Sequence, residues 1–266
     1  MSEENEIWAE LEANTVLELL PWAADTTFKR VAQDYDKPAG HKQTVVGVLA
    51  YTYLQDLLDR ATSCGEYALP ANINSTKGVD LLREGITQEA FEAMPRIDPA
   101  LISRSDYNGS PGWATGSTRW LLQSFPFGGI DKIQWSQKSL SKQIVADQPY
   151  ISPDETLVGW DELGVEEGVA ATIDEFVGTT LVLAHGFERE SGAFEMYLGR
   201  SRTRAHRGES PWHWKRLVIR GGGYVPEIKI PAEPLLPGNP PVRDEADADV
   251  RLRRPDLGES TGSAED

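Results

Sequence analysis

The stretch Thr179–Arg200, TTLVLAHGFERESGAFEMYLGR, decides the fold of the C-terminal half of this chain. Two runs rich in apolar and aromatic residues, 179–185 and 193–200, flank a short polar segment. The pair Ser191-Gly192 lies in that segment, and such pairs favour tight turns. The pattern therefore predicts a β-hairpin that turns at Ser191-Gly192.

Further strand patterns lie on both sides of this hairpin. Trp214–Arg220 and Tyr224–Ile230 are apolar segments separated by the triplet Gly221–Gly223. On the other side, Thr156–Trp160 has the pattern of a strand and Glu166–Phe176 that of a helix. The order of these elements predicts an antiparallel β-rich half, and a small OB-like barrel is one arrangement compatible with it.

The N-terminal half has a helical pattern instead. Residues 1–20 have near-helical apolar spacing, and Pro21 is expected to end that helix. Gln43–Thr62 has the widest apolar face and predicts a central, buried helix, with Gly65 as its C-cap. Thr87–Ala93 predicts a short helix capped by Thr87. Residues 96–129, dense in Gly, Ser, Pro and aromatic residues, predict a long irregular loop.

Together these patterns predict an α+β protein, with helices and strands segregated along the chain. Three regions follow: a mainly helical region with a Gly- and aromatic-rich loop at 1–150, a β-rich region with a basic hairpin at 151–231, and a tail at 232–266. Five prolines fall within 231–241, and residues 240–266 hold eight acidic and four basic residues. This composition predicts a disordered acidic tail.

The chain has 266 residues and a formal net charge of −16. Such a charge favours solubility and on average repels nucleic acid and anionic membranes. No apolar run approaches the roughly 18 residues needed to span a membrane, and the acidic N-terminus does not resemble a secretory signal. We therefore expect a cytoplasmic protein that does not engage a membrane. The single cysteine, Cys64, excludes an intrachain disulfide.

The main functional lead is a basic segment, Glu188–Arg220, which holds eight basic and four acidic residues in this acidic chain. Arg200, Arg202 and Arg204 alternate and would share a strand face, as would Trp212 and Trp214. Cations for phosphates and flat rings for bases are what single-stranded nucleic acid requires. The leading hypothesis is therefore a non-enzymatic nucleic-acid-binding protein that uses Arg189, Arg200, Arg202, Arg204, Arg207, Trp212, Trp214, Lys215 and Arg216.

The same surface allows two other interpretations. Arg and Trp are enriched at binding hot spots, so the chain could be a structural or protein-interaction subunit of a larger assembly. Alternatively, the arginines form a solvated sheet face and pair with the many carboxylates of this chain. Salt-dependent binding to an oligonucleotide would separate these interpretations.

Three weaker motifs complete the survey. Glu227-Ile228-Lys229 resembles the second half of the PD-(D/E)xK nuclease motif, and a metal-dependent nuclease using Glu227 and Lys229 is a further alternative. The upstream Asp of that motif is missing, since 191–226 contains no Asp. His206, Glu209 and His213 could bind zinc but match no metal-site spacing, so no metal is predicted.

The Gly-rich stretch 108–119 could hold a phosphate through its amides and hydroxyls, but it lacks the Gly-Lys-Ser/Thr of a Walker loop. No catalytic nucleophile stands out, and no cofactor is predicted.

Overall fold

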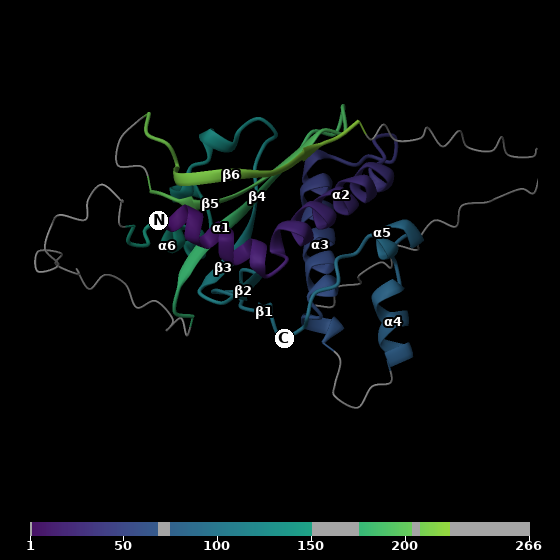
Figure 1. Cartoon of the computed structure of the whole chain (residues 1–266). Helices are drawn as coiled ribbons and strands as arrows, with labels where there is room; N and C mark the ends of the chain where they lie inside the picture. Colours follow the sequence, from purple (N-terminus) through teal and green to yellow (C-terminus); the bar gives the residue numbers. More distant parts are fainter. Residues whose placement is uncertain (1, 69–74, 151–175, 204–207, 224–266) are drawn as a thin grey trace, which may run out of the picture. The chain divides into compact units, whose positions relative to one another are not determined.

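The computed structural model describes residues 2–68, 75–150, 176–203 and 208–223, and they form an α+β fold (Figure 1). The helices are α1 (Glu3–Ala13), α2 (Val16–Asp34), α3 (Gln43–Ala61), α4 (Ser75–Arg83), α5 (Gln88–Glu92) and α6 (Leu140–Ala146). The strands are β1 (Ser103–Arg104), β2 (Gly112–Thr115), β3 (Thr118–Ser124), β4 (Thr179–Phe187), β5 (Phe194–Ser201) and β6 (Trp212–Gly221). Helices therefore dominate the N-terminal part and strands the C-terminal part, as the sequence predicts.

The strands form one six-stranded sheet in the order β1-β2-β3-β4-β5-β6. All neighbours are antiparallel except β3 and β4, which run parallel from Thr118↔Thr179 to Ser124↔His185. The C-terminal strands β4, β5 and β6 are antiparallel to one another, as the sequence predicts, and the single parallel pair joins them to the N-terminal strand β3. The OB-like barrel is not confirmed, because the described strands form a single sheet whose end strands are β1 and β6.

The long irregular loop predicted for 96–129 is wrong in its centre, which forms β1, β2 and β3. These strands are short, and β2 and the first five residues of β3 are buried on both faces, so no polar–apolar alternation marks them. The sheet consequently runs across residue 150, and the predicted regions 1–150 and 151–231 share it. All described residues lie within one compact unit, Met1–Glu227.

Each face of the sheet carries its own hydrophobic core. One face packs against α1, α2 and α3, and its cluster joins helix residues such as Phe28 and Leu54 to Trp120 and Phe194 of the sheet. The opposite face packs against the connection that follows β3 and against α6. Because β4 is covered on both sides, eight of its nine residues are buried.

The first predicted helix, 1–20, is two helices in the structure, and Pro21 lies inside α2 rather than at its end. The break falls at Thr15, which adopts a left-handed conformation with φ 64°. A proline inside a helix loses a backbone hydrogen bond, at a cost of about 3 kcal/mol. The apolar face of α2 offsets this cost, since Leu20, Ala24 and Phe28 are fully buried.

The predicted helix 43–62 is confirmed as α3, and its residues Leu54, Leu57 and Leu58 are buried as expected. Its C-terminus differs from the prediction. Ser63, with φ 53°, takes the left-handed position that ends the helix. The amide of Cys64 donates to Asp59 O (2.8 Å) and that of Ser63 to Arg60 O (3.3 Å), which is a Schellman cap.

The predicted hairpin and the predicted capping of α5 are also confirmed. The strands β4 and β5 pair from Val182↔Gly199 to Phe187↔Phe194, with Ser191 and Gly192 in the turn. The hydroxyl of Thr87 accepts a hydrogen bond from the amide of Ala90 (3.1 Å) and so caps α5.

Two register shifts interrupt the pairing of β5 with β6. Arg200 pairs with Trp214 while Ser201 pairs with Trp212, so one extra residue of β6 bulges there. A second shift lies between Met196 and Tyr197, opposite Ile219 and Leu217. Each bulge inverts the side-chain alternation, so Trp212 and Trp214 point to opposite faces of the sheet. The predicted shared face of these two tryptophans is wrong for this reason.

Four predicted segments fall outside the described residues: the strand 156–160, all but the last residue of the helix 166–176, the strand 224–230, and the tail 232–266. Among the described helices, none is long and apolar enough to cross a membrane.

Candidate functional site

Arg200 is directed into the protein. Its side chain lies on the face of β5 that packs against the N-terminal helices, and the residue is only 4% exposed. The guanidinium donates to Pro149 O (2.7 Å) and Gln148 Oε1 (3.4 Å) and lies 3.8 Å from Glu3 Oε1. The Arg200 guanidinium could bind a phosphate only if these partners were displaced.

The cations of β6 are bound by carboxylates that lie far away in the sequence. Each pair joins the strand to a different segment: Lys215 to Asp131 (2.8 Å), Arg216 to Glu4 (2.6 Å) and Arg220 to Glu195 (2.7 Å). The pairs of Lys215 and Arg216 are partly exposed, and such pairs contribute little to stability individually, about 0–1 kcal/mol. Glu195 differs, since its side chain is buried. These pairs do neutralise the positive charges of β6. The electrostatic field at this strand is therefore weaker than the number of basic residues in its sequence suggests.

The remaining arginines of the basic segment lie near the two ends of the hairpin. Arg189 donates to the hydroxyl of Tyr35 (3.3 Å), and Arg202 donates to Glu209 Oε2 (3.4 Å) with 38% of its side chain exposed. Arg204 and Arg207 lie outside the described residues. Among the predicted arginines that the structure describes, the side chains therefore do not come together on one face.

The two tryptophans of the predicted site are core residues. Trp212 is 3% exposed, donates from Nε1 to Ile130 O (3.1 Å), and meets the ring of Trp135 edge-on. Trp214 is 8% exposed and belongs to the core on the other face of the sheet. Neither ring is available to stack on a base.

The Gly-rich stretch 108–119 includes β2 and the turn into β3, and a carboxylate of this chain binds to that turn. The carboxylate of Glu10 accepts hydrogen bonds from the amide of Ser117 (2.9 Å) and from the hydroxyl of Thr118 (2.7 Å). Gly116, with φ 51°, allows this close approach, because a Cβ there would lie 1.9 Å from Glu10 Oε1. These donors, which the sequence suggested for a phosphate, hold α1 against the sheet.

The other predicted motifs are only partly within the described residues. Glu227, Lys229 and His206 lie outside them. Glu209 pairs with Arg202, and the ring of His213 stacks on Tyr150 at 4.1 Å. In the part of the chain that the structure describes, no group of three His, Cys, Asp or Glu side chains is arranged to hold a metal ion.

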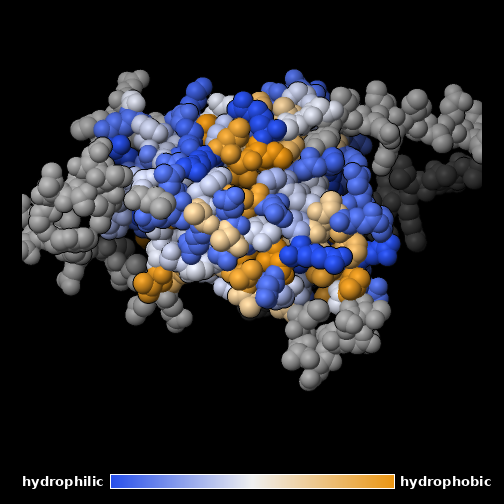
Figure 2. All heavy atoms as spheres, in the orientation of Figure 1, coloured by the Kyte–Doolittle hydropathy of each residue, from blue (hydrophilic) through white to orange (hydrophobic). Residues whose placement is uncertain are grey.

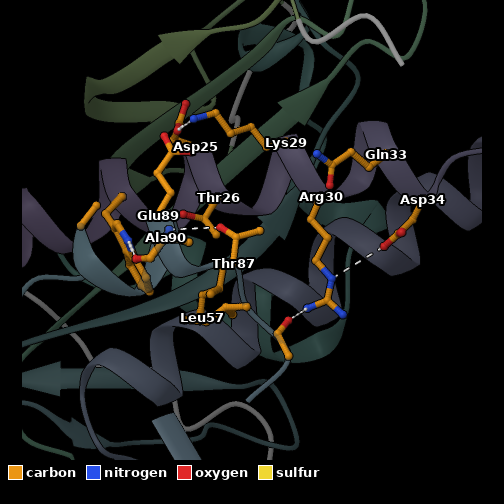
Figure 3. Close-up of a pocket in the computed structure, with 14 residues that line it drawn as sticks. Asp25, Thr26, Lys29, Arg30, Gln33, Asp34, Leu57, Thr87, Glu89 and Ala90 are labelled. Atoms are coloured by element: carbon orange, nitrogen blue, oxygen red, sulfur yellow. Dashed lines mark hydrogen bonds and ion pairs between the residues drawn. The ribbon is translucent and has the colours of Figure 1, made fainter. Parts of the chain in front are cut away.

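The sequence did not predict a pocket of about 380 Å³ between α2, the end of α3 and α5. Figure 3 shows the charged side chains of α2 lying on one side of it and Thr87, Glu89 and Ala90 on the other. Its apolar lining is Trp22, Leu57, Ile86, Ala90 and Ala93. The lining residues are as far apart in the sequence as Trp22 and Ala93, so no local motif could indicate the pocket.

The polar groups of this pocket are already paired with one another. Lys29 binds Asp25 (2.9 Å), and this hydrogen bond, opposed by partial burial, raises the pKa of Lys29. Arg30 lies 3.7 Å from Asp34 and stacks on the ring of Tyr53. No histidine or cysteine is among the lining residues. The pocket has the size of a small ligand site but lacks a nucleophile with an adjacent base.

Comparison with models of known protein families gave no match to this chain. Comparison with curated proteins gave no match. Comparison with solved structures likewise gave no match.

Proposed function

We propose that this chain is a non-enzymatic protein-interaction subunit that binds an extended segment of a partner protein along the outer edge of β6. The proposal rests mainly on the position of β6 at the end of the sheet. This ten-residue strand is the last in the sheet, and no described strand pairs with its outer edge. An unpaired edge presents a row of backbone donors and acceptors that can take up another strand.

The side chains of β6 support this use. Its centre, Leu217-Val218-Ile219, is apolar and partly exposed, and Leu217 is 49% exposed. Natural edges are often protected by unpaired charges, but here Lys215, Arg216 and Arg220 are each bound to a carboxylate of this chain. A partner strand would therefore pair with an edge whose positive charges are neutralised and whose central residues are apolar. Figure 2 shows apolar patches among hydrophilic side chains on the face of the protein that it draws.

Nucleic-acid binding is the second candidate. The partial exposure of Arg202 and Arg220 favours it, because a guanidinium has five donors and can bind a phosphate beside a carboxylate. The internal partners of Arg200 and Arg216 and the burial of both tryptophans count against it. The metal-dependent nuclease using Glu227 and Lys229 stays a prediction, because both residues lie outside the described ranges.

One experiment separates the two candidates. Ten-residue peptides displayed on phage are selected against the immobilised full chain, and synthetic copies of the selected peptides are titrated in solution. A single-stranded oligonucleotide is titrated in parallel at several salt concentrations. Leu217→Lys places an unpaired charge at the centre of the edge, and Lys132→Gln, at an exposed residue before α6, is the control.

We expect selected peptides with alternating apolar residues that bind Leu217→Lys at least about tenfold more weakly than wild type, a difference of about 1.4 kcal/mol. The control should bind like wild type. Peptides that bind both variants equally would refute the edge as the interface. An oligonucleotide that binds more tightly than about 10⁻⁴ M, with affinity falling steeply with salt, would favour the second candidate.

A further inference from the structure

The pocket between α2, the end of α3 and α5 lies on the side of α2 that faces away from the sheet. On the other side of this helix, the ring of Phe28 stacks on those of Phe187 and Phe194 in the sheet. Thr26 and Arg30 line the pocket and are each two positions from Phe28, so their side chains leave α2 in nearly the opposite direction. The pocket is therefore separate from the outer edge of β6.

Two hydrogen bonds hold the walls of this pocket together. The indole Nε1 of Trp22 donates to Ala90 O (2.9 Å), and Arg30 Nη1 donates to Gly85 O (3.3 Å). Trp22 and Arg30 lie about two turns apart on α2, so the helix is tied to the segment 85–93 at two separate points (Figure 3). The pocket is therefore formed before any ligand binds, as most small-molecule sites are.

Small side chains leave the space between these walls open. The lining residues with small side chains are Thr26, Gly85, Thr87, Ala90 and Ala93. The larger apolar residues are held in place elsewhere, Trp22 by its bond to Ala90 and Leu57 by the core that joins the helices to the sheet. A space of about 380 Å³ lacks the dispersion contacts that a close-packed protein makes. A ligand with an apolar surface would supply these contacts.

The charged side chains of the pocket favour an uncharged ligand. Lys29 lies 2.9 Å from Asp25, and Arg30 lies 3.7 Å from Asp34. The Arg30 guanidinium also covers the ring of Tyr53, 3.9 Å from its centre. A charged group on a ligand would have to lose its water and compete with these internal partners, whereas an apolar ring displaces only water.

We propose that this pocket binds a small uncharged molecule built on one flat aromatic ring system. The ring packs between Trp22, Leu57 and Ala90, where aromatic contacts contribute beyond the burial of apolar area. A rigid ring also loses less conformational freedom on binding than a flexible chain does. Thr26 and Gln33 supply a hydroxyl and an amide, which bond to a neutral polar substituent of the ligand.

The first test measures the binding of two matched pairs of indole derivatives to the full chain by ligand-observed NMR. Tryptophol and tryptamine share the ring and the side-chain length, but only tryptamine is charged at neutral pH. Indole-3-acetamide and the anionic indole-3-acetate form the other pair. We expect both neutral compounds to bind with a Kd of about 1 mM or tighter, which is within the reach of ligands of this size. The charged member of each pair should bind about fivefold or more weakly, because its charge must be desolvated beside groups that already have partners.

The second test fills the pocket. Ala90→Leu places a larger side chain in it and should weaken tryptophol binding at least about tenfold. Ala93→Leu fills the pocket from another lining position and should act likewise, so the test does not depend on one variant. Ala13→Leu, at an exposed position at the end of α1, is the control and should bind tryptophol like wild type. Tryptophol should raise the melting temperature of wild type and of the control but not that of the two pocket variants.

Three results would overturn the proposal. The first is that neither neutral compound binds at concentrations up to about 5 mM. The second is equal binding to wild type and to both pocket variants, which would place the bound compound elsewhere. The third is tighter binding of either charged compound than of its neutral match. Leu217→Lys should bind tryptophol as wild type does, so failure of the edge interface and failure of this pocket are distinguishable.

Discussion

The burial of His185 predicts that the protein loses stability as the pH falls from about 7 to about 5. His185 is 2% exposed on β4, beside the ring of Phe28, and its Nε2 has no hydrogen-bond partner among the residues that the structure describes. Burial lowers its pKa from the ordinary 6.5 to about 4. Between these two values the unfolded chain binds a proton that the folded chain does not, so acid favours unfolding. At pH 5 the stability should be about 2 kcal/mol lower than at pH 7.5 from this residue alone.

The assay is urea unfolding at these two pH values for wild type and His185→Leu. Carboxylates also change stability with pH, but they contribute equally to both proteins. The difference between them should therefore isolate His185, and the variant should lose about 2 kcal/mol less than wild type between pH 7.5 and 5. Phe187→Leu alters the same strand face two residues away and controls for a general loss of packing. An equal loss in wild type and His185→Leu would refute the reasoning, because His185 would then bind a proton in the folded state as readily as in the unfolded chain.

Three further predictions concern stability. Leu54→Ala should cost roughly 2–5 kcal/mol because Leu54 is fully buried on α3, and a near-neutral value in urea unfolding would mean that the core cluster is wrong. Glu10→Ala should cost about 1–3 kcal/mol by leaving the Ser117 amide and Thr118 hydroxyl without their acceptor, whereas Glu12→Ala, at an exposed position one residue after Leu11, should be nearly neutral. Ser63→Gly should raise the free energy of unfolding by up to about 1 kcal/mol, since glycine tolerates the left-handed conformation there, and a loss of stability would refute this account of the cap.

The elements that the sequence predicts correctly have strong local patterns. The apolar stripe of α3 repeats over five turns, and the β4–β5 hairpin has two apolar runs around Ser191-Gly192. β1, β2 and β3 lack such a pattern, because β2 is buried throughout and β1 has only two residues. Pro21 was misleading because tertiary packing of α2 outweighs a local helix-breaking preference.

The predicted site depended on information that the sequence does not contain. A count of charges cannot reveal that Arg216 pairs with Glu4, 212 positions away. Nor can residue spacing reveal a bulge at His213, which turns Trp212 and Trp214 to opposite faces.

The way α1 is attached to the sheet has a consequence for the synthesis of this protein on the ribosome. Glu10 of α1 binds Thr118, Glu3 binds Thr179, and Glu4 binds Arg216, at separations of 108, 176 and 212 residues. At translation rates of about 5–20 residues per second, the first helix is complete on the order of 10–40 s before the last of these partners emerges. During that interval the apolar side chains of Ile7 and Leu11, which are buried in the finished protein, have no sheet to cover them. The nascent chain should therefore bind chaperones at α1 until the strands that hold this helix have left the exit tunnel.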